Sequence, residues 1–156
     1  MKIQKYGLLI LRDQYFSDFP FESMMSNKYE SRPYYLAVQE RSGIIWVVPL
    51  SSQIDKYKAA IQKHETARGA GTCIYYHIAK IMGEESAFLI GDMIPVSENY
   101  IKKPFTLRSI PYVMENKTEI KSIQKKVSKY LALVRNGKLT PYVDILKIEQ
   151  SLLAKL

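Results

Sequence analysis

The chain has 156 residues, of which 47% are hydrophobic, enough for one substantial core and too few for two. We therefore expect a single domain over residues 1–156. No apolar run reaches the length of a membrane span and charge appears early in the chain, so we expect a cytoplasmic protein. The single cysteine, Cys73, excludes an internal disulfide and a zinc site built from thiolates, and we expect it to be a buried packing residue.

The formal net charge of +8 favours a polyanionic partner, usually nucleic acid. Ten Lys and Arg stand against four Asp and Glu from Thr106 onward, so most of the charge lies in the last third of the chain. A helical array of this kind can track a phosphate backbone, although a merely basic surface is the alternative. Charge alone identifies neither a nucleic-acid sequence nor a reaction.

The first half of the chain predicts strands. YGLLIL, PYYLAVQ and IIWVVPL are rich in β-branched and aromatic residues and are bounded by turn residues. Residues 40–43 have the length and chemistry of a tight hairpin between the last two. The mixed polar and aromatic segment between the first two indicates a short helical turn and then a long loop, and such loops are often functional.

The third strand passes into a helix at Ser51 and Ser52. In the following IDKYKAAIQKH, apolar and aromatic residues recur at helical spacing. Serine is a favoured helix N-cap, so capping alone is the simplest interpretation of both serines. Glycines at 69 and 71 end this helix, and CIYYHIAKIMG and SAFLIGDMIPV predict two more strands joined by a turn.

Two helices are expected at the C-terminus. The first is amphipathic and basic, closes at Gly137, and has an apolar stripe formed by Ile120, Ile123, Val127, Tyr130, Leu131 and Val134. Thr140 and Pro141 predict the cap and first turn of the second helix. The expected fold class is α+β: a compact, highly twisted antiparallel sheet or partial barrel with packed helices.

Several common chemistries are excluded because their motifs are missing. The chain has no phosphate-cradling G-x-x-x-x-G-K-[ST], no G-x-G-x-x-G after a strand and no H-E-x-x-H, so we expect no cofactor and no metal. Of the two histidines, His77 alternates with apolar neighbours and is interpreted as a hydrogen-bonded core residue. The serines lack the context of a nucleophile elbow.

Polar and cationic residues gather around the strand-to-helix junction. The candidate catalytic residues are Ser51, Ser52, Arg32, Tyr34, Lys56 and His64. RNA cleavage suits them, because RNA supplies its own 2′-hydroxyl nucleophile and needs only alignment, charge neutralisation and proton exchange. The cations would neutralise charge, the serines would hydrogen-bond the phosphate or the 2′-hydroxyl, and His64 or a tyrosine would carry a proton. The expected products are a 2′,3′-cyclic phosphate and a 5′-hydroxyl.

Further residues are candidates for RNA binding: Lys28, Tyr29, Tyr57, Lys58, Lys121, Lys125, Lys126 and Lys129. Tyrosines can stack on unpaired bases, and lysines can contact phosphates. The alternatives are ordinary solvated charges for Arg32 and the lysines, and half-buried packing for the tyrosines. His64 follows Ile61 at helical spacing, so it can also simply continue the apolar stripe of its helix.

RPYYLAV, IIWVVPLSS with its lysine-bearing helix, and LIGDMIPV resemble the type III toxin-antitoxin endoribonucleases, the ToxN and AbiQ group, and most closely its CptN branch. The resemblance extends over most of the chain, and PLSS is its most specific element. It implies a barrel-like sheet with added helices, related to the MazF and Kid toxins.

The resemblance also implies that Ser51 and Ser52 match the family's Thr/Ser-Ser active-site pair, with Ser52 as the critical hydroxyl. ToxN-type members carry a lysine two residues after that serine, where this chain has Ile54 and then Lys56. They carry another lysine just after the proline of the preceding strand. Tyr34 stands there in this chain, with Arg32 as the plausible substitute.

The partners implied by the resemblance are RNAs. Family members cleave their own repeat precursor into short pseudoknotted RNA antitoxins, which bind across the active-site groove and join toxin copies into closed toxin-RNA assemblies. Free toxin would cleave cellular mRNA, arrest growth and take part in abortive infection of phage. Two alternatives stay open: a non-catalytic RNA-binding module, and a protein-binding toxin of related fold that poisons a topoisomerase.

Overall fold

The computed structural model describes residues 2–20 and 30–156. Lys28 and Tyr29, two predicted RNA contacts, lie outside the described residues. The elements in chain order are β1 (Leu8–Leu11), α1 (Asp13–Asp18), β2 (Pro33–Gln39), β3 (Ile45–Ser51), α2 (Ile54–Arg68), β4 (His77–Ile81), β5 (Glu84–Phe88), η1 (Ile90–Asp92), β6 (Ile94–Val96), η2 (Glu98–Tyr100), β7 (Ile101–Pro104), β8 (Thr106–Leu107), β9 (Ile110–Pro111), α3 (Lys117–Arg135) and α4 (Ile145–Leu153).

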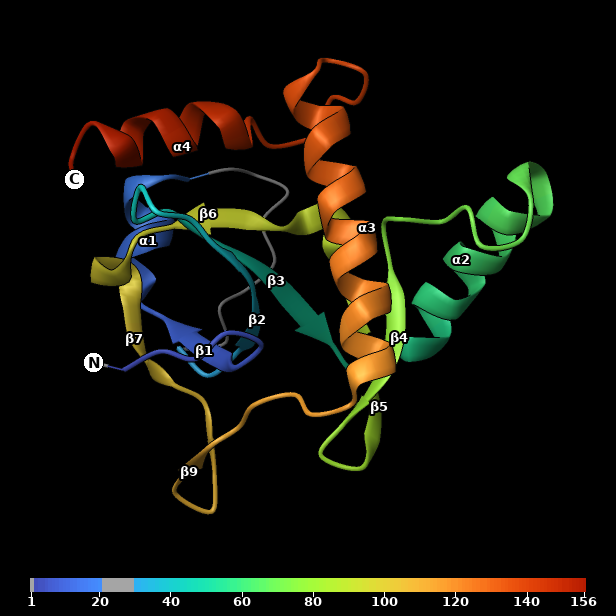
Figure 1. The fold of residues 1–156 in the computed structure, drawn as a ribbon, viewed down its shortest axis with the longest axis horizontal. Coiled ribbons are helices and arrows are strands. Elements are labelled where there is room, and N and C mark those ends of the chain that lie inside the picture. Colours follow the sequence, from blue (N-terminus) through green and yellow to red (C-terminus); the bar gives the residue numbers. More distant parts are fainter. Residues whose placement is uncertain (1, 21–29) are drawn as a thin grey trace.

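The main sheet has seven strands, and its pairs are antiparallel. The order is β4-β5-β3-β2-β1-β7, and β6 also pairs with β3. Because β6 and β7 follow one another through the short η2, the strands β6-β3-β2-β1-β7 curve back on themselves as a partial barrel (Figure 1). The α+β prediction with an antiparallel sheet is confirmed.

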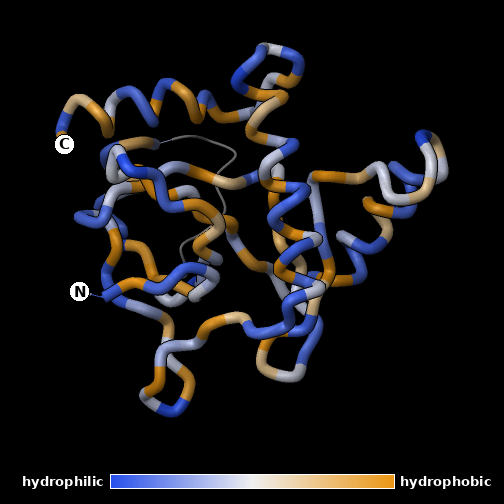
Figure 2. Tube along the Cα trace, viewed as in Figure 1, coloured by the Kyte–Doolittle hydropathy of each residue, from blue (hydrophilic) through white to orange (hydrophobic). Residues whose placement is uncertain are grey.

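Helices close the core around this sheet. Trp46, Tyr35 and Phe88 are among the largest fully buried side chains, and they come from three neighbouring strands. α4 packs on β6, whereas α2 packs on β4 and β5 (Figure 1). In Figure 2 the helices alternate between hydrophilic and hydrophobic residues, as expected of helices with one face on a core. No helix in the described part of the chain has both the length and the apolar character needed to cross a bilayer.

The register of β3, β5 and β4 sorts their side chains onto two faces. Leu50 lies opposite Phe88, which lies opposite His77, and these residues face α3. Ser51 lies opposite Ala87, which lies opposite Ile78, and these residues share the other face, which α2 covers with Tyr57. Because side chains alternate along a strand, this register fixes which candidate residues can meet.

Two local predictions were wrong. α4 begins at Ile145 and not after Thr140–Pro141, because the Asp144 carboxylate accepts a hydrogen bond from the Lys147 backbone N–H and caps the helix there. The stretch SAFLIGDMIPV is not one strand: η1 divides it into β5 and β6. The hairpin at Glu40–Gly43, the helical turn of α1 and the αL glycine after α3, Gly137, are confirmed.

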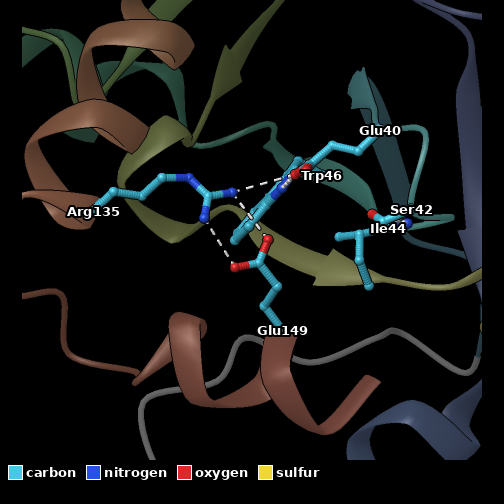
Figure 3. A network of polar contacts seen from close by, with 6 residues as sticks. All are labelled: Glu40, Ser42, Ile44, Trp46, Arg135 and Glu149. Atoms are coloured by element: carbon cyan, nitrogen blue, oxygen red, sulfur yellow. Dashed lines mark hydrogen bonds and ion pairs between the residues drawn. The ribbon is translucent and has the colours of Figure 1, made fainter. Parts of the chain in front are cut away.

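A polar network ties the two C-terminal helices to the β2–β3 hairpin (Figure 3). Both terminal nitrogens of Arg135 on α3 donate to the Glu149 carboxylate on α4, at 3.0 and 2.9 Å. One of them also donates to Glu40 at 3.3 Å, and Glu40 accepts from the indole N–H of Trp46. The guanidinium lies 5.7 Å from the Trp46 ring centroid. A single planar cation therefore links three elements that are far apart in sequence.

We predict that Arg135→Met lowers the free energy of unfolding by about 1–3 kcal/mol, because Glu149, only 7% exposed, would lose its paired charge. Urea unfolding measures this. The double variant Arg135→Met/Glu149→Gln should recover part of the loss, since it no longer buries an unpaired carboxylate. If the double variant lost more free energy of unfolding than the two single variants lose together, this account would be contradicted.

Candidate functional site

The candidate site lies where β3 ends and α2 begins. Arg32 precedes β2, and its Nη2 donates to the Leu50 backbone carbonyl at 2.7 Å, so the guanidinium lies against the end of strand β3. Tyr34 lies opposite Pro49 in the β2–β3 register, and alternation places Arg32 on the same face as Tyr34 and Ser51. This is the face that α2 covers, so Arg32, Ser51 and the first turn of α2 are neighbours.

The two serines have different roles in the turn. Ser51 is 6% exposed, and its Oγ accepts from the Gln53 backbone N–H at 3.2 Å. The Ser52 side chain is exposed, while its backbone carbonyl accepts from Ile54 at 2.8 Å. Ser52 therefore presents its hydroxyl to solvent, and Ser51 shapes the turn that holds it there.

The capping interpretation of these serines was wrong. The N-cap of α2 is Gln53, and no side chain caps it. The turn formed by Ser51 Oγ and the Gln53 N–H shifts the helix start by two residues. The first turn of α2 thus keeps backbone N–H groups for an anion, next to an exposed hydroxyl and the Lys56 side chain.

Arg32 is not a solvated surface charge, because only 2% of it is exposed. Burial lowers its pKa, while Tyr34, Tyr57 and Asp92 oppose that shift. A cation held inside the protein acts over a longer range than one in water. Arg32 therefore makes the electrostatic potential near the turn more positive, and the exposed Lys56, whose Nζ lies 5.3 Å from the Tyr57 ring centroid, adds a second positive charge.

The structure corrects the predicted role of two tyrosines. Tyr34 is 3% exposed, and burial raises its pKa far above the ordinary value, so it is poorly suited to exchange protons near neutrality. Tyr57 is also buried and packs against Tyr76, with ring centroids 4.9 Å apart. Its ring has no free face broad enough to stack on a base.

His64 lies away from the serine turn. α2 is continuous, so ten residues of helix, about 15 Å, separate His64 from Ile54. The His64 ring instead packs edge-on against Tyr75, with centroids 5.7 Å apart. The structure thus does not bring His64 to the serine turn, because nearness in sequence does not bring residues together along a straight helix.

The predicted phosphate contacts divide into exposed and paired lysines. Lys121, Lys125 and Lys129 are exposed and lie four residues apart on α3, so they form a stripe along one side of the helix. Lys58 donates to Glu85 on β5 at 2.8 Å. Lys126 turns inward, and its Nζ lies 2.8 Å from His77 Nδ1. Neither Lys58 nor Lys126 is thus an unengaged phosphate ligand.

His77 joins β4 to α3 through two polar contacts. Its Nε2 lies 3.2 Å from the Glu119 carboxylate, and its Nδ1 receives the Lys126 ammonium. A lysine ammonium can only donate, so this contact favours the neutral imidazole with its proton on Nε2. The prediction of a hydrogen-bonded core histidine is confirmed, as is the burial of Cys73, which is 1% exposed.

Sequence reasoning missed Asp92, Tyr76 and Tyr142. Asp92, on η1, interacts electrostatically with Arg32 and Lys56. Tyr76 precedes β4, and its pKa is raised by burial and, to a smaller extent, by Asp92 and Tyr142. Tyr142 is fully exposed in the loop before α4. The only sequence signal for Tyr76 is its place next to His77, because side chains alternate along a strand and Tyr76 would then lie on the face opposite His77. An aromatic ring in open solvent, such as that of Tyr142, can stack on an unpaired base, whereas the buried Tyr57 ring cannot.

No family model matches the sequence, and no curated protein matches it. Among solved structures, the chain is similar to AbiQ, a lactococcal anti-phage endoribonuclease of a type-III toxin-antitoxin system. The TM-score is 0.42 at 16% sequence identity, over 85% of this chain and 76% of that one. Among residues 2–20 and 30–156, no three His, Cys, Asp or Glu side chains are grouped to share a metal ion.

We predict that His77 makes the stability of the protein depend on pH. Burial lowers the pKa of His77 below 6.5, and Lys126 lowers it further against the opposing effect of Glu119. The native state then binds fewer protons than the unfolded state, so this contribution is complete above pH 6.5 and is lost as pH falls.

Urea unfolding at pH 8 and pH 5.5 tests this. The free energy of unfolding should fall more for the wild type than for His77→Gln over that interval. Equal decreases in the two proteins would show that His77 contributes nothing to it.

Proposed function

We propose that this protein is an endoribonuclease toxin of a type III toxin-antitoxin system, of the ToxN and AbiQ group and nearest to its CptN branch. One observation carries the proposal: the exposed Ser52 hydroxyl stands at a helix N-terminus without a side-chain cap, two residues after the Leu50 carbonyl that holds the buried Arg32 and four residues before the exposed Lys56. That arrangement suits a phosphate whose negative charge increases in the transition state. The resemblance of the PLSS segment to the family's active-site turn supports it.

The reaction is a transesterification that needs no metal. The ribose 2′-hydroxyl attacks the adjacent phosphorus, and the leaving 5′-oxygen departs in line. Ser52 hydrogen-bonds a non-bridging oxygen or the 2′-hydroxyl, the first turn of α2 and Lys56 bind the phosphate, and Arg32 stabilises the added charge from within the protein. The products are a 2′,3′-cyclic phosphate and a 5′-hydroxyl.

The RNA antitoxin would use a second surface besides this turn. The stripe of Lys121, Lys125 and Lys129 is exposed on α3, which also packs on the β4 side of the sheet through His77. An RNA that occupies the turn of one toxin and the stripe of another would join copies head to tail, and such a contact closes into a ring when its rotation permits. By resemblance, the antitoxin is a pseudoknot that the toxin cuts from its own repeat precursor, and the other substrate is cellular mRNA.

Cleavage of single-stranded RNA in EDTA tests the activity. We expect the wild type to cleave and to leave 2′,3′-cyclic phosphate ends, and Ser52→Ala to lose at least 100-fold in rate. Ser42→Ala, an exposed serine in the β2–β3 hairpin, is the matched control and should cleave at the wild-type rate. RNA that is bound and remains intact would identify a non-catalytic binding module, and no RNA binding at all would favour the protein-binding toxin.

The lysine stripe is tested by the salt dependence of RNA affinity. We expect the triple variant Lys121→Ala/Lys125→Ala/Lys129→Ala to bind 2′-O-methyl RNA more weakly, and its plot of log affinity against log salt to be shallower by about 2. The control variant Lys2→Ala/Lys103→Ala/Lys147→Ala removes the same charge from exposed positions elsewhere. If the two triple variants had equal slopes of log affinity against log salt, the RNA would not contact the lysine stripe on α3.

A further inference from the structure

α2 leaves an open groove between itself and the two strands at the edge of the sheet. Among the fifteen residues of α2, all of which the structure describes, only Tyr57 is buried, so the helix is anchored at its first turn. Past that turn, α2 runs away from β4 and β5 toward its C-terminal end (Figure 1). The groove between them has a volume of about 560 Å³. This volume is typical of sites that bind small ligands.

The groove begins next to the serine turn. Ser51 lies opposite Ala87 in the β3–β5 register, so Glu85, two residues away along β5, is the diagonal neighbour of Ser51 on the same face. Diagonal neighbours of this kind lie about 7–8 Å apart. Glu85 accepts from Lys58, one turn into α2, at 2.8 Å, and this ion pair lines the groove at the end nearest the turn. A base of the nucleotide that is cut at the turn can therefore reach the groove.

One side of α2 forms a wall of the groove. Its lining residues follow the helical spacing i, i+3, i+4, i+7 and i+8 and are Lys58, Ile61, Gln62, Glu65 and Thr66. On the sheet, β4 contributes Ile78, which faces the same side as Ala87 and Ser51. Ile61 and Ile78 are both half-buried, so each adds an apolar surface. Aliphatic surfaces with a few polar groups around them suit the flat ring of a base.

The polar groups of the groove are mainly hydrogen-bond acceptors. The carboxylates of Glu65 and Glu85 only accept, the Gln62 amide and the Thr66 hydroxyl can do both, and the Lys58 ammonium is already engaged by Glu85. Among the described lining residues two carboxylates thus stand against one ammonium, so the groove repels a phosphate. It favours a group with N–H donors. Adenine, cytosine and guanine each carry an exocyclic amino group, whereas uracil carries only carbonyl oxygens outside its ring.

We propose that this groove recognises a base with an exocyclic amino group, next to the phosphate that is cut at the serine turn; the inference rests on the proposed function. Glu65 accepts a hydrogen bond from the amino group, and Gln62 hydrogen-bonds the neighbouring atom of the ring edge. Ile61 and Ile78 contact the ring. Uracil would place a carbonyl oxygen against the Glu65 carboxylate, so that neither acceptor has a donor. The groove thus selects the base, while the serine turn and Lys56 bind the phosphate.

Single-turnover cleavage of chimeric oligonucleotides tests the groove. Each oligonucleotide has one ribonucleotide in a 2′-O-methyl strand, which fixes the cut, and A, C, G or U stands in turn on each side of it. We expect the wild type to cleave the uracil substrate about tenfold more slowly than the others at one of the two positions. Glu65→Gln should bring the four rates to within about threefold of one another, because an amide can donate to uracil as well as accept from an amino group.

Gln62→Ala should also reduce the preference, mainly by slowing cleavage of the three substrates whose base has an amino group. Two matched controls remove the same groups elsewhere: Glu98→Gln on η2 and Gln150→Ala on α4, both at exposed positions. Both controls should keep the wild-type preference. A wild type that cuts all four substrates equally, or groove variants that slow all four by the same factor, would overturn the inference.

Purine riboside, which is adenosine without its amino group, tests which group Glu65 recognises. In the wild type, replacing the recognised adenosine by purine riboside should slow cleavage about tenfold. In Glu65→Gln the same replacement should slow cleavage much less, because the two changes remove the same interaction. Equal effects of the replacement in the two proteins would also overturn the inference.

The wild-type protein separates the two proposals. If it cleaves RNA and its base preference does not depend on Glu65 or Gln62, only the inference about the groove falls. If it leaves every RNA intact, the proposed function and the inference fall together.

Discussion

The candidate site depends on β3 having both of its edges paired. β2 pairs with one edge from Ile45 to Pro49, while on the other edge β6 pairs with Ile45–Val47 and β5 with Leu50 and Ser51. All seven residues of β3 are buried. Because neither edge is free, the backbone cannot slide in register, and the turn that follows has a fixed direction. The exposed Ser52 is thus one residue beyond the most constrained segment of the fold.

The electrostatics of the turn follow from a buried charge that the fold has to accommodate. Placing Arg32 inside the protein is costly unless its donors are satisfied and counter-charge is near. The Leu50 carbonyl accepts from it, and Asp92, Tyr34 and Tyr57 are the groups that favour its charged form. The same low dielectric that makes Arg32 expensive to bury strengthens its attraction for an incoming phosphate. Asp92 therefore helps to offset the cost of burying the cation.

Local patterns in the sequence predicted the elements but not their tertiary surroundings. β2, β3 and the two C-terminal helices follow from alternation and helical periodicity, which are properties of a few neighbouring residues. The serine turn was found because a strand pattern meets a helix pattern there. The start of α4 was missed because Asp144 caps it, although Thr140–Pro141 carry an equally common start signal.

The candidate site was predicted in part because half of it is local and half is not. Ser51, Ser52 and Lys56 are close in sequence, so their grouping needs no knowledge of topology. η1, which carries Asp92, comes close to the end of β3 only because β5 pairs with β3 and the Leu89 N–H donates to the Pro49 carbonyl, and no local pattern encodes that path. His64 is the converse case: it is near the turn in sequence, and the rigid rise of α2 carries it away.

α3 carries lysines that point into solvent and one lysine that points toward the sheet, and only the solvent-facing lysines are available to RNA. Lys121, Lys125 and Lys129 recur every four residues and remain in solvent, whereas Lys126 points toward the sheet, where its ammonium lies against His77 Nδ1 on β4. The inward lysine thus belongs to the contact that sets the position of α3 on β4. Tyr130, one turn further along the helix, donates to Gly91 and so fixes η1, the turn that carries Asp92. The helix that presents the basic stripe is therefore also the element that supports η1, so an RNA that displaced α3 would disturb both.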